Sequence, residues 1–136
     1  MRIVIARIVI MLMAVTAAIG NPGRRERDCR GNPKVIAGCF SIHGRAFASN
    51  GTPDLRIWRI GTRRILGVTA TSMPDDAEEP IAPENLLRAL GGTEHFVFGD
   101  FEVCPFTAER EGEMQMVCVQ KANHLVLKPY GWSGKR

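Results

Sequence analysis

The sequence lacks the short motifs that identify common catalytic and nucleotide-binding sites. It contains no G-x-S-x-G, S-x-x-K or H-E-x-x-H pattern, so no local pattern indicates an activated serine or a catalytic zinc. The glycine pair Gly91-Gly92 is followed by Thr93 and Glu94, without the lysine of a phosphate-binding loop. These absences favour binding over catalysis, and we expect no cofactor.

The sequence also lacks an apolar run long enough to cross a membrane. Arg2 and Arg7 precede an uncharged stretch at residues 8–19, roughly twelve residues long, whereas a spanning helix needs roughly twenty. The small residues of Ala18-Ile19-Gly20 then suit a signal peptidase. The pattern predicts a secretory signal peptide at residues 1–20 rather than a retained anchor, and therefore an exported protein, periplasmic or extracellular, with no stable membrane anchor.

A strong charge of either sign is missing as well. The formal net charge of the whole chain is +4. Removal of residues 1–20 takes away two arginines, which leaves about +2. So weak a positive charge gives no reason to expect a nucleic-acid partner.

The chain contains four cysteines, Cys29, Cys39, Cys104 and Cys118, all beyond the expected signal peptide. An even number of cysteines in an oxidising compartment predicts disulfides. If residues 104 and 118 face each other across a hairpin, the spacing favours a Cys104–Cys118 bridge and leaves Cys29 to pair with Cys39. Pairing of Cys39 with Cys104 or Cys118 stays open, because sequence alone does not fix connectivity.

Alternating apolar and polar residues, separated by turn sequences, predict a mainly β domain. The expected strands are residues 36–48, 54–60, 65–70, 94–104, 114–120 and 124–129. A single antiparallel barrel or sandwich of about six strands is the expected closure. The domain itself is expected at residues 36–128, after a flexible lead-in at 21–35 and before a tail at 129–136.

One short helix is expected near residues 83–90. Pro83 is acceptable in a first helical turn, and Glu84 suits the positive end of the helix dipole. Gly91-Gly92 then ends the helix. The preceding residues, 71–83, are rich in proline and acidic residues and predict a protruding loop.

The densest group of candidate binding residues lies in the stretch DLRIWRIGTRR. Arg56 and Trp58 share one face of an expected strand, and Arg63 and Arg64 lie in the adjacent turn. A guanidinium beside an indole can hold an anion or stack on a sugar ring. The alternative is a core Trp58 with arginines arranged around it.

Asp100 and Glu102 offer the only hint of catalysis, since they share a strand face two residues apart. The simpler interpretation is that Asp100 caps a bend at Gly99 and Glu102 pairs with an arginine. Cys39 and His43 also share a face, but their spacing is not that of a zinc site. We expect no metal.

The runs CFSIHGRAFASNGTPDLRIWRIGTRRILGV, FGDFEVCPFT and MQMVCVQKANHLVL resemble a group of small exported bacterial proteins of unknown function. The resemblance covers about residues 39–128. It implies export and a single domain, and it carries no activity.

These observations together predict an exported small β domain that acts as a non-catalytic binding or accessory module of the periplasm or envelope. The expected partner is an anionic or sugar-containing envelope component or another exported protein. Two alternatives stay open: a small hydrolase that uses Asp100 and Glu102, and a purely structural envelope protein.

Overall fold

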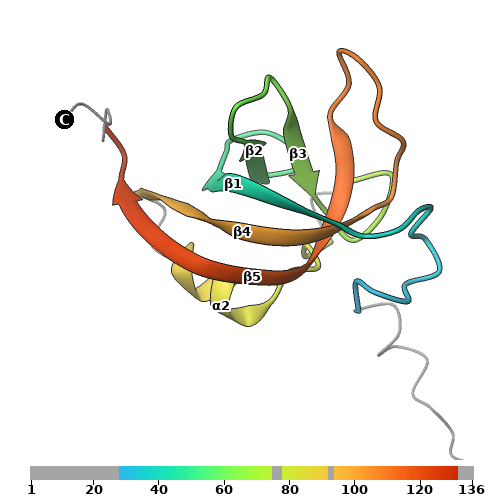
Figure 1. The fold of residues 1–136 in the computed structure, drawn as a ribbon, viewed down its shortest axis with the longest axis horizontal. Helices are drawn as coiled ribbons and strands as arrows, with labels where there is room; N and C mark the ends of the chain where they lie inside the picture. Colours follow the sequence, from blue (N-terminus) through green and yellow to red (C-terminus); the bar gives the residue numbers. More distant parts are fainter. Residues whose placement is uncertain (1–27, 75–77, 92–93, 132–136) are drawn as a thin grey trace, which may run out of the picture.

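The computed structural model describes residues 28–74, 78–91 and 94–131. These residues form five strands and one short helix (Figure 1). The strands are β1 (Phe40–Ala48), β2 (Leu55–Arg59), β3 (Ile65–Val68), β4 (His95–Pro105) and β5 (Gln115–Pro129), and the helix is α2 (Glu84–Ala89). The expected signal peptide lies outside the described residues. Within them, no helix has the length and apolar character required to span a membrane.

The expected mainly β class with one short helix is confirmed, but the expectation of six strands is wrong. The sequence pattern separates residues 114–120 from 124–129, whereas the structure joins them in the single strand β5. The intervening Lys121-Ala122-Asn123 contains no glycine or proline to form a turn. A bulge takes the place of a turn: the register of β4 and β5 shifts between Phe98 and Asp100.

The strands are ordered β1-β2-β3-β5-β4, and β4 also pairs with β1, so the order returns to its first strand. All neighbours are antiparallel except β3 and β5, which run parallel. A parallel pair needs a long connection, and here the chain between β3 and β5 contains α2 and β4. The wholly antiparallel sheet expected from the sequence is therefore wrong at this one pair.

Side chains on the inner face of the sheet form the main core. The side chains of β1 alternate between the core and the outside, since Ile42 and Ala46 are buried and Ser41, His43, Arg45 and Phe47 beside them are more exposed. The other buried members come from every strand and from the helix: Leu55, Ile57, Leu66, Val68, Leu86, Val97, Phe101, Val103, Val117, Val119 and Ala122.

Helix α2 closes one side of this core, as Figure 1 shows beside β5. Leu86 is fully buried in the main core. The side-chain amide of Asn85 donates a hydrogen bond of 2.7 Å to the backbone oxygen of Ala122 on β5. The helix expected near residues 83–90 is confirmed, with Pro83 immediately before its first turn.

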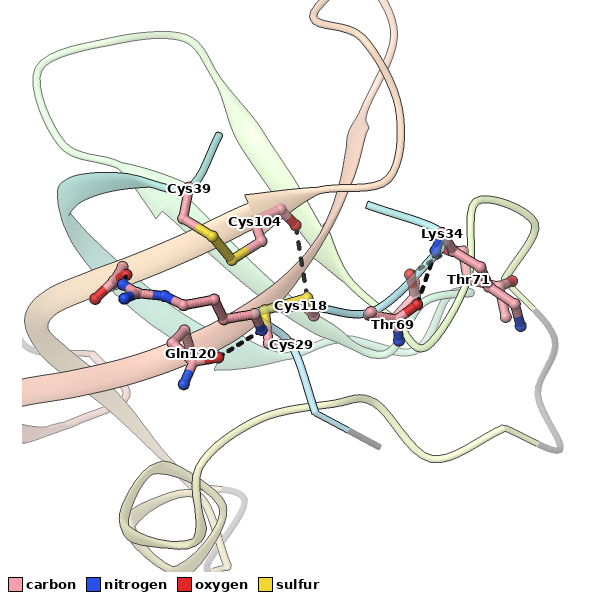
Figure 2. Close-up of a disulfide and its surroundings, with 11 residues drawn as sticks. Cys29, Lys34, Cys39, Thr69, Thr71, Cys104, Cys118 and Gln120 are labelled. Carbon is pink, nitrogen blue, oxygen red and sulfur yellow. Dashed lines mark hydrogen bonds and ion pairs between the residues drawn. A yellow bond between two sulfur atoms is a disulfide. The ribbon is translucent and has the colours of Figure 1, made fainter. Parts of the chain in front are cut away.

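Two disulfides cross-link the segment before β1 to the ends of β4 and β5 (Figure 2). Cys29 bonds to Cys118 and Cys39 bonds to Cys104. The favoured Cys104–Cys118 bridge, and with it Cys29–Cys39, is therefore wrong, whereas the open alternative Cys39–Cys104 is confirmed. Cys104 and Cys118 do lie opposite each other.

The reason for this pairing is the contact between β1 and β4. Phe40 lies opposite Val103, so the preceding Cys39 comes beside Cys104. Such long-range strand pairing cannot be read from sequence spacing.

A second, smaller core forms around the disulfides, and we call it the stapled end: Cys29, Cys104, Phe106 and Cys118, with Val35, Cys39, Ile81 and Met116 packed against them. Part of the expected flexible lead-in belongs to it. Cys29 is 2% exposed, and the backbone N–H of Arg30 donates to the side-chain oxygen of Gln120 at 2.6 Å. Ile36 N–H donates to the backbone oxygen of Pro105 at 2.9 Å.

Candidate functional site

The polar and aromatic side chains that the main core excludes gather on the outer face of three strands. Residues opposite each other in paired strands share a face, so the registers of β1 with β2 and β4 define this surface. We call it the outer face: Ser41, His43, Arg45, Phe47, Arg56, Trp58, Phe96, Phe98, Asp100 and Glu102.

Arg45 lies at the centre of the outer face among three aromatic rings. Its Cζ atom is 4.2 Å from the ring centroid of Phe96, 4.9 Å from that of Trp58 and 5.7 Å from that of Phe47. These are distances at which a cation is attracted by aromatic rings. Phe96 also packs against Tyr130, with their ring centroids 4.6 Å apart. We call these five residues the aromatic–arginine cluster.

Arg45 has no acidic partner in the part of the chain that the structure describes. None of the ion pairs there includes it, and its Nε atom is buried without a hydrogen-bond partner. Aromatic rings hold the guanidinium in place but do not neutralise its charge. The cluster therefore presents an uncompensated cation at a half-buried aromatic surface.

Two of the four residues singled out in the sequence belong to the outer face. Trp58 is half-buried and donates its indole N–H to the backbone oxygen of Thr62 at 2.8 Å. Arg56 lies on the same face of β2, and its Nε donates to the backbone oxygen of Pro53 at 3.0 Å. Trp58 is thus neither a core residue nor paired with Arg56, because the guanidinium that contacts it is that of Arg45.

The other two residues point elsewhere. Arg64 forms an ion pair with Glu109, with 3.1 Å between Nε and Oε1. Its Nη1 atom donates a hydrogen bond of 2.8 Å to the backbone oxygen of Arg110. Arg63 is exposed and, with Arg64, lines a shallow hollow of about 210 Å³. The structure therefore does not bring the four predicted residues together.

Next to the aromatic–arginine cluster, one carboxylate lies between two histidines. Asp100 on β4 is hydrogen-bonded through Oδ1 to His43 Nδ1 and through Oδ2 to His124 Nδ1, both at 2.9 Å. The side chains are 62% exposed for His43, 51% for Asp100 and 83% for His124. We call these three residues the His–Asp–His cluster.

The bulge in β5 places His124 in this cluster. His124 has a φ of 54°, in the left-handed region that few non-glycine residues adopt. On the opposite strand, a Cβ added to Gly99 would lie 2.7 Å from Leu125 Cδ2 and 2.9 Å from the backbone oxygen of Asn123. A glycine is therefore needed at the bend that the sequence predicts at Gly99, because any side chain would displace the bulge.

The two histidines lower the pKa of Asp100 below its ordinary value of 3.8, chiefly through the hydrogen bond from His43 and then that from His124. Glu102, two residues further on, forms an ion pair with Arg30. The interpretation that Glu102 pairs with an arginine is confirmed. A hydrolase with these two carboxylates needs one of them as a protonated acid. Both carboxylates already have donor partners within the protein, the two histidines for Asp100 and Arg30 for Glu102, so the geometry gives that alternative no support.

A hollow of about 420 Å³ is lined by residues 49–54, 68–70, 74 and 78–80, none of which belongs to the outer face. Among these described residues, the charged side chains are Asp54, Glu78 and Glu79. For metal ions, the described residues contain a single group of converging ligand atoms, the sulfurs of Cys29, Cys104 and Cys118. All three sulfurs are in disulfides, and a disulfide sulfur is not a thiolate ligand.

Most residues of the site escape the sequence analysis, which singles out only Trp58 of the aromatic–arginine cluster and does not single out His124. Alternation on β1 does place Arg45 on the polar face of its strand, but Phe96 and Trp58 come beside it only through strand pairing. The proximity of His124 to Asp100 depends on the bulge. Comparison with protein-family models, with curated proteins and with solved structures finds no match.

Proposed function

We propose that this chain is an exported, non-catalytic binding module that holds an anionic or sugar-containing ligand at the aromatic–arginine cluster. The observation that carries the proposal is the position of Arg45, whose charge is held by three rings and has no acidic partner among the described residues. A cation left uncompensated at the surface suits an anion supplied by a ligand.

The chemistry of the cluster indicates which groups the ligand carries. A guanidinium has five N–H donors in a planar fork that matches a carboxylate, sulfate or phosphate. The aromatic rings at its side offer apolar surface to a sugar or another planar ring. Tyr130, at the edge of the cluster, is 43% exposed and so available for such a contact. An acidic glycan combines both features.

The strand order supports a binding role by analogy of fold. We infer that the closed order β1-β2-β3-β5-β4 forms a small five-stranded barrel of the OB type. Barrels of that type bind oligosaccharides or oligonucleotides on the face of strands 2 and 3 and the adjoining loops, and Trp58 of the cluster lies on β2. A fold alone does not determine function, so the case depends on Arg45 and its neighbours.

Export is supported by the cysteines. Both disulfides are compatible with an oxidising compartment outside the cytoplasm. The expected signal peptide at residues 1–20 agrees with this location. An acidic envelope glycan is then a partner that the protein would meet.

A binding assay with a matched pair of arginine variants tests the proposal. The probe is a fluorescein-labelled dextran sulfate fragment, with neutral dextran as the negative control. We expect Arg45→Gln to weaken binding about tenfold or more, because a charge-assisted hydrogen bond contributes about 1.5–3 kcal/mol. Arg63→Gln removes the same formal charge from an exposed turn and is expected to change the affinity less than about twofold.

Equal effects of the two substitutions would show that net charge alone attracts the probe, and the proposed site would be wrong. Failure of the wild-type protein to bind dextran sulfate at low salt would overturn the binding function itself. That second result would favour the purely structural alternative.

A further inference from the structure

We propose that the His–Asp–His cluster makes the aromatic–arginine cluster bind anions more tightly in mildly acidic solution. This inference rests on the proposed function and adds to it a form of regulation at the same surface. It is carried by the geometry that links His43, Asp100 and His124 in one row across β1, β4 and β5.

Protonation can change the charge of the His–Asp–His cluster without breaking its hydrogen bonds. Each neutral imidazole donates its Nδ1–H to one oxygen of Asp100, which leaves Nε2 as the ring atom that can accept a further proton. No hydrogen bond within the described residues involves Nε2 of His43 or His124. Both side chains are more than half exposed, and the proton can therefore come directly from solvent.

The change in charge amounts to two elementary charges. With both imidazoles neutral the cluster carries −1 from Asp100, and with both protonated it carries +1. The lowered pKa of Asp100 keeps that carboxylate ionised in mild acid. Asp100 therefore does not offset the charge that the histidines gain.

The charged groups around the cluster do not cancel this change. On β1 the neighbour is Arg45, whereas Arg59 at the end of β2 lies opposite Gly44 and so on the other face of the sheet from His43. On β4 Glu102 is already paired with Arg30 of the preceding segment, and on β5 Lys121 lies opposite Glu102. Arginine, lysine and glutamate side chains ordinarily keep their charges between about pH 5.5 and 7.5.

Arg45 lies close enough to the His–Asp–His cluster for the change in charge to affect an anion bound beside it. His43 and Arg45 lie two residues apart on the same face of β1, which separates them by roughly 7 Å along the strand. This is less than the screening length of about 8–10 Å at physiological salt. An anion held at Arg45 is repelled by the cluster at neutral pH and attracted to it in acid. His124 on β5 is separated from β1 by β4 and lies roughly 12 Å from Arg45, so its charge contributes less than that of His43. Together the two charges in a solvated site change an affinity about two- to fivefold.

The test measures the affinity for the dextran sulfate fragment at about pH 7.5 and 5.5, at constant ionic strength. Sulfate esters keep their charge over this range, so any pH dependence comes from the protein. We expect the wild-type protein to bind about two- to fivefold more tightly at the lower pH. The double variant His43→Gln/His124→Gln is expected to bind equally at both values.

His95→Gln serves as the matched control, since His95 is the third histidine of the chain and hydrogen-bonds to the backbone oxygen of Ala89 instead. This variant is expected to keep the pH dependence. Wild-type binding with equal affinity at both pH values would overturn the inference and leave the proposed function intact, as would a pH dependence that persists in the double variant. Absence of wild-type binding at both pH values would overturn the proposed function and the inference with it.

Discussion

The stapled end and the outer face differ in whether their reactive and charged groups have partners within the protein. At the stapled end, Cys29, Cys104 and Cys118 are at most 2% exposed, and every cysteine is in a disulfide. On the outer face, Asp100 is about half exposed and Arg45 has no acidic partner among the residues described. The first region holds the chain together, and the second leaves charge available to a ligand.

This difference predicts which property each region controls. Substitutions at the stapled end remove covalent cross-links and buried apolar contacts, so they should reduce the free energy of unfolding. Substitutions on the outer face alter solvated charges, which contribute little to stability. They should change ligand affinity and its pH dependence instead.

The largest expected effect comes from removal of one disulfide. The double variant Cys29→Ser/Cys118→Ser opens the cross-link between residues separated by 89 positions. We expect the free energy of unfolding to fall by about 2–5 kcal/mol, as is typical when a small domain loses a native disulfide. Urea denaturation followed by tryptophan fluorescence measures this loss.

The same variant also tests whether the two regions are independent. Under conditions where it is still folded, its affinity for dextran sulfate should match that of the wild-type protein. A loss of affinity in the folded variant, or an unchanged free energy of unfolding, would contradict the separation of roles.

A much smaller effect on stability is expected for Asp100→Asn. The folded-state pKa of Asp100 is lowered by the hydrogen bonds from His43 and His124. The ionised carboxylate therefore stabilises the fold above the ordinary pKa of 3.8, and this contribution is lost as the pH falls through the lower folded-state value.

Urea midpoints at two pH values test this direction. The variant should unfold at a slightly lower urea concentration than the wild-type protein at about pH 7, and the difference should shrink as the pH falls below 3.8. A difference that grows as the pH falls would show that the sign assigned to Asp100 is wrong.

Local patterns were sufficient for the elements of the fold but not for their partners. Alternation located the strands except that it divided β5 into two, and Pro83 with Gly91-Gly92 located the helix, because these signals act within a few residues. The disulfides required the pairing of β1 with β4, which joins residues about sixty positions apart. The hairpin argument correctly placed Cys104 opposite Cys118, yet each sulfur bonds to the segment before β1.

The candidate site was predictable to the same extent: positions within one strand follow from the sequence, and contacts between strands do not. Alternation placed Trp58 and Arg56 on one face of β2, as the structure has them. It could not indicate that Arg45, rather than Arg63 or Arg64, would lie against the indole, since that contact depends on the register of β1 and β2. The bulge at His124 depends on a further register shift in β5.

The most direct test of the proposed binding surface is an amide chemical-shift titration of the ¹⁵N-labelled protein with a short dextran sulfate fragment. The account predicts the largest shifts at Arg45, Trp58 and Phe96, with little change at Cys104 and Cys118. Shifts concentrated at the turn that carries Arg63, or at the stapled end, would contradict it.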